Sequence, residues 1–164
     1  MASECSFDIV SKVDLQEVDN AIQQTMKEVR TRYDFKGSVS EVTRKGGEVT
    51  ILADDRFRLR SVLEILNQRL AKRGVPLKAM KTSEPRESSG GTVTQVMTLQ
   101  EGIGTDQARE IVKIIKGLKT KAQPTIMGDQ LRVKAKSKDE LQSVMATLRE
   151  KNLDFDIQFT NYRS

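Results

Sequence analysis

Five consecutive residues near the end of the first predicted helix combine the side chains that a nucleotide pocket needs. They are Arg32, Tyr33, Asp34, Phe35 and Lys36. An aromatic ring or a guanidinium plane can stack on a base, which contributes ~1–3 kcal/mol per base. The carboxylate can accept hydrogen bonds from the ring N–H and amino group of guanine, and the cations can bind phosphate or a guanine edge. The segment therefore predicts nucleotide binding. The alternative is that the two rings close the end of a hydrophobic core, or that each ring takes one of the two roles.

A second group of cations, in the C-terminal half, could bind phosphate. It consists of a strand set, Arg132, Lys134 and Lys136, and a helix set, Arg109, Lys113 and Lys116. Side chains alternate along a strand, so the strand set shares the face that points away from the helices. Residues 109–138 hold nine Lys or Arg and two acidic residues, a net charge of 9 − 2 = +7. Clustered cations favour binding to the phosphate groups of RNA, DNA or nucleotides. The simpler interpretation of the cluster is a charged surface that keeps the protein soluble.

The composition excludes several kinds of enzyme. The 164 residues contain no histidine and one cysteine, so Ser-His-Asp and Cys-His catalysis and Cys-rich zinc sites are absent. The sequence has no Gly-x-x-x-x-Gly-Lys-Ser/Thr phosphate loop, and no cluster of carboxylates predicts a magnesium site. We therefore expect a binding protein rather than an enzyme, with no catalytic residues, no metal and no cofactor.

The composition also bears on location. The single cysteine, Cys5, cannot form an internal disulfide, which fits a reducing cytoplasm. The N-terminus lacks the basic and apolar regions of a secretory signal, and no apolar run approaches the ~20 residues of a spanning helix. We expect a cytoplasmic protein that makes no contact with a membrane.

The elements that must position these residues occur twice along the chain. A shift of 82 residues, which places Gly46 on Gly128, aligns a strand hairpin and its following helix, and a shift of 90 aligns the upstream helices. The first copy therefore holds about eight extra residues, 30–37, which include the five-residue segment. Each copy has the order β-α-β-β-α-β, which is ferredoxin-like. The predicted fold class is α+β, with a tandem duplication of this unit.

Hydrophobic periodicity and helix caps place the elements. The predicted helices are 14–31, 56–72, 106–118 and 138–148, and the predicted strands are 7–10, 39–43, 49–53, 77–80, 93–99, 125–127, 131–135 and 154–159. The polar, Ser- and Gly-rich residues 83–91 predict a flexible linker. The predicted central strands carry no aromatic residue, so the usual stacking of RNA on a sheet surface is not expected. Phe57, near a helix start, is expected in the core.

Segments along the whole chain resemble the bacterial YajQ family. They include residues 6–14, 16–21, 31–35, 72–74, 111–113, 130–133, 143–146 and 159–163. The resemblance implies a small cytosolic nucleotide-binding protein with two ferredoxin-like domains that exchange their first strands. Some members are reported as cyclic di-GMP receptors that contact a transcription regulator and DNA, and others bind RNA or GTP. The resemblance implies no catalytic residues, because the family has no agreed ones.

With this exchange, the first domain comprises 12–82 with the strand 92–100, and the second comprises 101–164 with the strand 5–11. The predicted function is a non-enzymatic nucleotide-binding protein that acts as a cyclic di-GMP receptor and influences transcription. The alternative is an RNA- or DNA-binding protein that uses the basic strand and helix.

Overall fold

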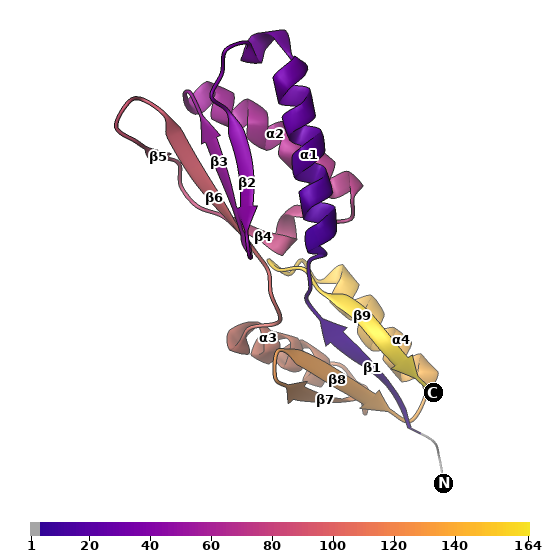
Figure 1. The fold of residues 1–164 in the computed structure, drawn as a ribbon. Helices are drawn as coiled ribbons and strands as arrows, with labels where there is room; N and C mark the ends of the chain where they lie inside the picture. Colours follow the sequence, from indigo (N-terminus) through magenta and orange to yellow (C-terminus); the bar gives the residue numbers. More distant parts are fainter. Residues whose placement is uncertain (1–3) are drawn as a thin grey trace. The chain divides into compact units, whose positions relative to one another are not determined.

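The computed structural model describes residues 4–164 (Figure 1). Within this range the chain has four α-helices and two antiparallel sheets, which confirms the prediction of an α+β fold. The helices and strands divide between two compact units. Unit 1 contains residues 4–12 and 101–164, and unit 2 is the continuous segment Val13–Gln100.

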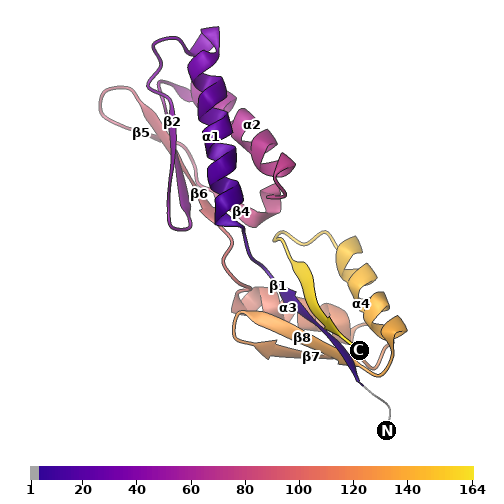
Figure 2. The ribbon, with the colours of Figure 1, turned by 45° about the vertical axis from the view of Figure 1, so that its right-hand side comes forward.

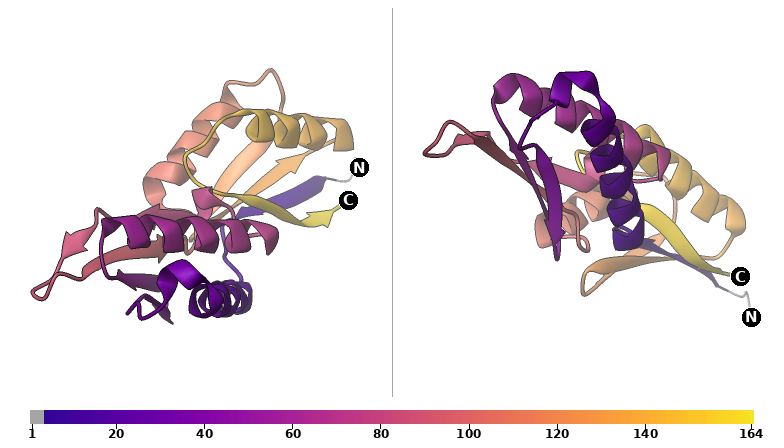
Figure 3. Two further views of the ribbon diagram at one scale, coloured as in Figure 1. Left: turned by 90° about the horizontal axis from the view of Figure 1, so that it is seen from above. Right: turned by 45° about the horizontal axis from the view of Figure 1, so that its top comes forward.

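Unit 2 builds its sheet from strands in the order β2-β3-β6-β4, with the short β5 paired to β6. Its elements are α1 (Leu15–Thr31), η1 (Tyr33–Phe35), β2 (Glu41–Lys45), β3 (Glu48–Ala53), α2 (Arg56–Lys72), η2 (Leu77–Ala79), β4 (Met80–Thr82), β5 (Arg86–Glu87) and β6 (Val93–Leu99). Helix α1 begins after Asp14, whose carboxylate accepts hydrogen bonds from the amides of Gln16 and Glu17. Both helices pack on one face of the sheet, where their apolar side chains and those of β3 form one core (Figure 3).

Unit 1 builds its sheet in the order β7-β8-β1-β9. Its elements are β1 (Cys5–Val10), α3 (Thr105–Lys116), β7 (Gln123–Met127), β8 (Gln130–Ala135), α4 (Lys138–Glu150) and β9 (Gln158–Arg163). Leu131, Val133 and Ala135 of β8 are buried with the apolar stripes of α3 and α4. Side chains alternate across a sheet, so the residues between them on β8 lie on the face that the helices leave open.

Each sheet takes a central strand from one end of its unit's sequence, the N-terminal end in unit 1 and the C-terminal end in unit 2. β1 lies between β8 and β9, with Phe7 opposite Val133, and β6 lies between β3 and β4, with Met97 opposite Val49 (Figure 2). Unit 2 is therefore inserted into unit 1, directly after the first strand of unit 1. The chain leaves and re-enters unit 1 at neighbouring positions, since the amide of Gly102 donates to the carbonyl of Ser11 at 2.8 Å.

Residues 83–91, for which the sequence predicts a linker, lie inside unit 2 rather than between the units. Strand β5 is part of this segment and pairs with β6, with Arg86 opposite Thr94. The amide of Ser83 donates to the carbonyl of Val96 at 2.8 Å, and Gln95 Nε2 donates to the carbonyl of Ser83 at 2.7 Å. These bonds make the segment an extension of the sheet edge, where polar side chains face solvent.

Candidate functional site

The five residues predicted to bind a nucleotide form a tight turn directly after α1. The amide of Phe35 donates to the carbonyl of Arg32, and the amide of Lys36 donates to the carbonyl of Tyr33, both at 3.1 Å. Gly37 follows with φ +75°, a left-handed conformation that favours glycine. The turn sends successive side chains in different directions, so the segment has an outer and an inner part.

The two aromatic rings of this turn differ in exposure. Phe35 is 5% exposed and belongs to the core of unit 2, so its ring has no free face for a base. Tyr33 is 89% exposed and is the ring available at the surface. Stacking on a base was predicted for both rings, but only Tyr33 is exposed enough to do so. The Phe35 ring instead closes the end of the core.

Arg32 and Asp34 form a paired hydrogen-bonding unit beside Tyr33. Arg32 Nε donates to Asp34 Oδ1 at 3.0 Å, and Nη2 donates to Oδ2 at 2.8 Å. The guanidinium carbon lies 5.5 Å from the centre of the Phe35 ring, and Glu28 lies 3.5 Å from Nη1. The hydrogen bonds from Arg32 hold the pKa of Asp34 below its ordinary value, so its carboxylate is ionised at neutral pH. Each carboxylate oxygen keeps capacity for a second hydrogen bond, as recognition of guanine needs.

The start of α2 adjoins this turn, and the sequence did not identify it as part of the site. Asp54 accepts hydrogen bonds from the Ser38 hydroxyl and from the amide of Val39, the latter at 3.1 Å. The positive charge of Arg58 also contributes to the lowered pKa of Asp34. Phe57, which the sequence assigns to the core, is 67% exposed. Helical phase explains the error: Phe57 is two residues before the buried Leu59, about 200° away around the helix.

The strand set of cations begins with an ion pair that the sequence did not predict. Arg132 lies opposite Asp8 of β1, and its Nε donates to Asp8 Oδ1 at 2.9 Å. Asn161 Nδ2 donates to Asp8 Oδ2 at 2.8 Å. The hydrogen bond from Arg132 lowers the pKa of Asp8, although its burial acts in the opposite direction. The partner of Arg132 is therefore a nearly buried carboxylate within the sheet, and much of this cation's charge is already balanced.

A bulge in β9 brings Asn161 to this network. Ser6 pairs with Arg163 and Asp8 pairs with Thr160, so two residues of β9 face one residue of β1. Asn161 has φ +55°, a left-handed conformation that Asn tolerates better than most residues. The extra residue shifts the alternation of side chains between the two faces of β9, and the Asn161 amide therefore lies beside Asp8.

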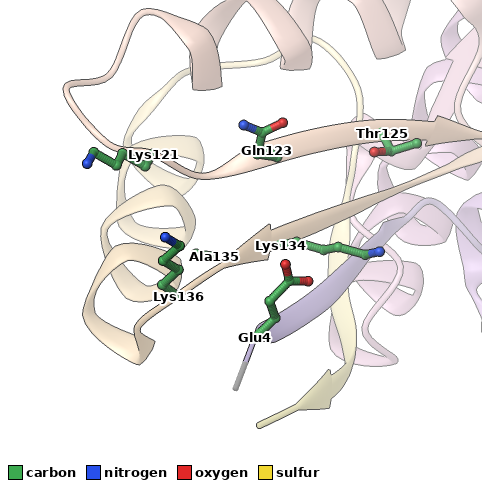
Figure 4. Close-up of a pocket in the computed structure, with 7 residues that line it drawn as sticks. All are labelled: Glu4, Lys121, Gln123, Thr125, Lys134, Ala135 and Lys136. Atoms are coloured by element: carbon green, nitrogen blue, oxygen red, sulfur yellow. The ribbon is translucent and has the colours of Figure 1, made fainter. Parts of the chain in front are cut away.

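Lys134 and Lys136 are exposed and line a hollow of about 590 Å³ (Figure 4). The hollow is lined by Glu4, Lys121, Gln123, Thr125, Lys134, Ala135 and Lys136. Gln123 and Thr125 lie on β7, opposite Lys134 and Arg132 of β8. The lining thus combines three ammonium groups with one carboxylate and two neutral polar groups, a set that suits a phosphate group.

The helix set lies on the opposite side of unit 1. Ala108, Ile111 and Ile115 of α3 are buried toward the sheet. Arg109, Lys113 and Lys116 occupy the outer side of α3 and are exposed. The strand set lies on the face of the sheet that α3 and α4 leave open, so the structure does not bring the two predicted sets together.

Across residues 4–164, no three or more His, Cys, Asp or Glu side chains are grouped so that they could hold a metal ion. Over the same part of the chain, no helix has the length and apolar character needed to cross a membrane.

Comparison with known proteins identifies the family. Residues 5–163 match the family described as "Nucleotide-binding protein YajQ-like". A nucleotide-binding protein of Geobacter sp. (strain M21) is 50% identical over 159 residues, which cover 97% of this chain and 99% of the relative. A nucleotide-binding protein of Desulforamulus reducens is 47% identical over 165 residues, which cover 100% of this chain and 99% of the relative. The chain therefore belongs to the YajQ-like family.

Proposed function

We propose that the chain is a non-enzymatic, cytoplasmic nucleotide-binding protein that binds cyclic di-GMP, and that its occupancy influences transcription. The observation that carries this proposal is the Tyr33 ring, which is 89% exposed beside the paired Arg32 and Asp34 side chains. Relatives that match nearly the whole chain are named as nucleotide-binding proteins, which supports the same class of ligand.

Each residue of the turn has a role in this proposal. Tyr33 stacks on a guanine, and Asp34 accepts hydrogen bonds from the ring N–H and amino group of that base. Arg32 holds the carboxylate in place and offers its remaining N–H groups to phosphate. Lys36, which is exposed at the end of the turn, adds positive charge for the same phosphate. Phe35 supports Arg32 from the core side.

Isothermal titration with cyclic di-GMP tests this proposal, with GTP as the competing nucleotide. We expect Tyr33→Ala to weaken binding of cyclic di-GMP by about 5-fold to 100-fold, because one stacking contact is lost. Tyr162→Ala, which removes a partly exposed tyrosine from unit 1, is the matched control and should leave the affinity unchanged. Equal affinities for the wild type and Tyr33→Ala would contradict the assignment of the site.

We also propose that both units are ferredoxin-like domains related by duplication. The two sheets support this, because β6 has the same place in the order of unit 2 as β1 has in unit 1. In this description, residues 5–11 complete the domain of 101–164, and residues 92–100 complete the domain of 12–82.

A second candidate function is RNA or DNA binding along the open face of unit 1. The hollow lined by Lys121, Lys134 and Lys136 favours it, since three cations line one hollow and clustered cations favour phosphate groups. Lys134→Glu with Lys136→Glu should then weaken binding of a short RNA at every sequence and flatten its salt dependence. Lys113→Glu with Lys116→Glu makes the same charge change on the opposite side of the unit. If both pairs weaken binding equally, the open face is not the RNA site.

A further inference from the structure

We infer that Phe57, in the first turn of α2, is a second base-stacking residue and that the site therefore takes a ligand with two bases. This inference rests on the proposed nucleotide-binding function and extends its site from η1 to α2. Phe57 and Tyr33 come from different elements, so each ring can receive a base of its own.

The fold places η1, which carries Tyr33, and the start of α2, which carries Phe57, at one end of unit 2. Strand β3 ends at Ala53, and α2 begins three residues later beside the turn that holds η1 (Figures 1 and 3). Asp54 receives hydrogen bonds from Ser38 and Val39, which follow η1. These bonds attach the segment that carries Tyr33 to the segment that carries Phe57.

Exposure distinguishes these two rings from the other large apolar side chains. Among the residues that the structure describes, Tyr33 at 89% and Phe57 at 67% are the most exposed large apolar side chains. Phe7, Phe35 and Phe155 are buried at 5% exposure or less. Neither exposed ring fills a core, so both are free to contact a ligand.

Paired charged residues flank both Tyr33 and Phe57 in the sequence and offer hydrogen bonds. Asp55 Oδ1 accepts from the amide of Arg58 at 2.7 Å, and Asp55 Oδ2 accepts from Arg58 Nη1 at 2.6 Å. Arg32 and Asp34 form the matching pair beside Tyr33. Each ring therefore lies, in the sequence, between the two members of an oriented guanidinium–carboxylate pair. That combination matches a base, which has an apolar face and a polar edge, better than it matches an apolar segment of another protein.

A base stacks on one ring face at a time, and two rings on separate elements therefore suit two bases joined by a short backbone. A mononucleotide can use only one ring. We expect the wild type to bind cyclic di-GMP more tightly than GMP, and we expect Phe57 to account for much of this difference.

Titration calorimetry with cyclic di-GMP and with GMP tests the inference on the full chain. Phe57→Leu keeps an apolar side chain but removes the ring, and it should weaken cyclic di-GMP binding by about 5-fold to 100-fold. It should also reduce the preference for cyclic di-GMP over GMP. Phe57→Tyr keeps the ring and should retain the affinity. Leu77→Ala, at an apolar residue of η2 that is 63% exposed, is the control and should change neither affinity.

The outcomes separate this inference from the function on which it rests. If the wild type binds neither probe, the proposed function fails and the inference fails with it. If the wild type binds cyclic di-GMP and Tyr33→Ala weakens it, but Phe57→Leu does not, the function stands and the inference is wrong. Equal weakening of both probes by Phe57→Leu, or weakening by Leu77→Ala, would also overturn it. Retention of binding in Phe57→Leu would instead fit an apolar surface for a protein partner.

Discussion

Tyr33 and Phe35 lie two residues apart in one turn, yet they face solvent and core respectively. This difference separates stability from binding at the scale of single residues. Phe35→Ala should lower the free energy of unfolding by about 3–5 kcal/mol, because it leaves a cavity in the core of unit 2. Tyr33→Ala should change it by about 0.5 kcal/mol or less. Urea denaturation measures both, and an unchanged unfolding midpoint in Phe35→Ala would show that its ring is not part of the core.

At the scale of elements, the carboxylate of Asp8 connects three strands. Asp8 lies on β1 and accepts hydrogen bonds from Arg132 of β8 and from Asn161 of β9. The pKa of Asp8 is lowered in the folded chain, chiefly by the hydrogen bond from Arg132. Its contribution to stability is therefore present above the unfolded value of about 3.9, and it is lost as the pH falls below that value. Asp8→Asn should cost about 1–3 kcal/mol of unfolding free energy at pH 7.

The same variant should differ less from the wild type at pH 3, because protonation of Asp8 weakens the contact in the wild type as well. Urea denaturation at both pH values measures this change. Asp154→Asn, at an exposed carboxylate of unit 1, is the control for the loss of a negative charge. A constant difference between Asp8→Asn and the wild type across this range would mean that the ionised carboxylate does not join the three strands.

The whole molecule is an insertion of one continuous unit into another. All of the core residues of unit 2 lie within 13–100, whereas the core of unit 1 includes Phe7 and Ile9 of β1. A fragment of residues 13–100 should therefore fold alone, and a fragment of residues 101–164 should not, because it lacks a central strand. Circular dichroism with thermal unfolding distinguishes a cooperative transition from its absence.

Unit 1 should fold again when residues 1–12 are joined to 101–164 by a short flexible linker. The 2.8 Å hydrogen bond between Gly102 and Ser11 shows that the two ends to be joined are close together. If the fragment 101–164 folds cooperatively without β1, unit 1 does not need β1 and is not one discontinuous domain.

Local periodicity predicted much of the secondary structure, since apolar spacing and caps act within a few residues. The predicted helix 56–72 is α2, and the predicted strand 131–135 lies within β8. The last strand, predicted over 154–159, is Gln158–Arg163 instead. Leu153 and Phe155 are buried in the loop before it, so their apolar character did not signal a strand.

Long-range pairing could not be predicted in the same way. The ion pair of Asp8 with Arg132 joins residues that are 124 positions apart, and no local pattern assigns such partners. The place of β1 in the sheet with β8 was expected only through the family resemblance. For the candidate site, the sequence identified the five-residue segment but not which ring faces solvent. The exposure of Phe57 was open to prediction from its helical phase relative to Leu59.

Amide chemical shifts of the ¹⁵N-labelled chain, followed during titration with cyclic di-GMP, would locate the bound nucleotide on the protein. We expect shift changes concentrated in residues 30–40 and 54–60 of unit 2, with the amides of β7 and β8 unaffected. Changes confined to the open face of unit 1, around Lys121 and Lys134, with none in η1, would contradict it.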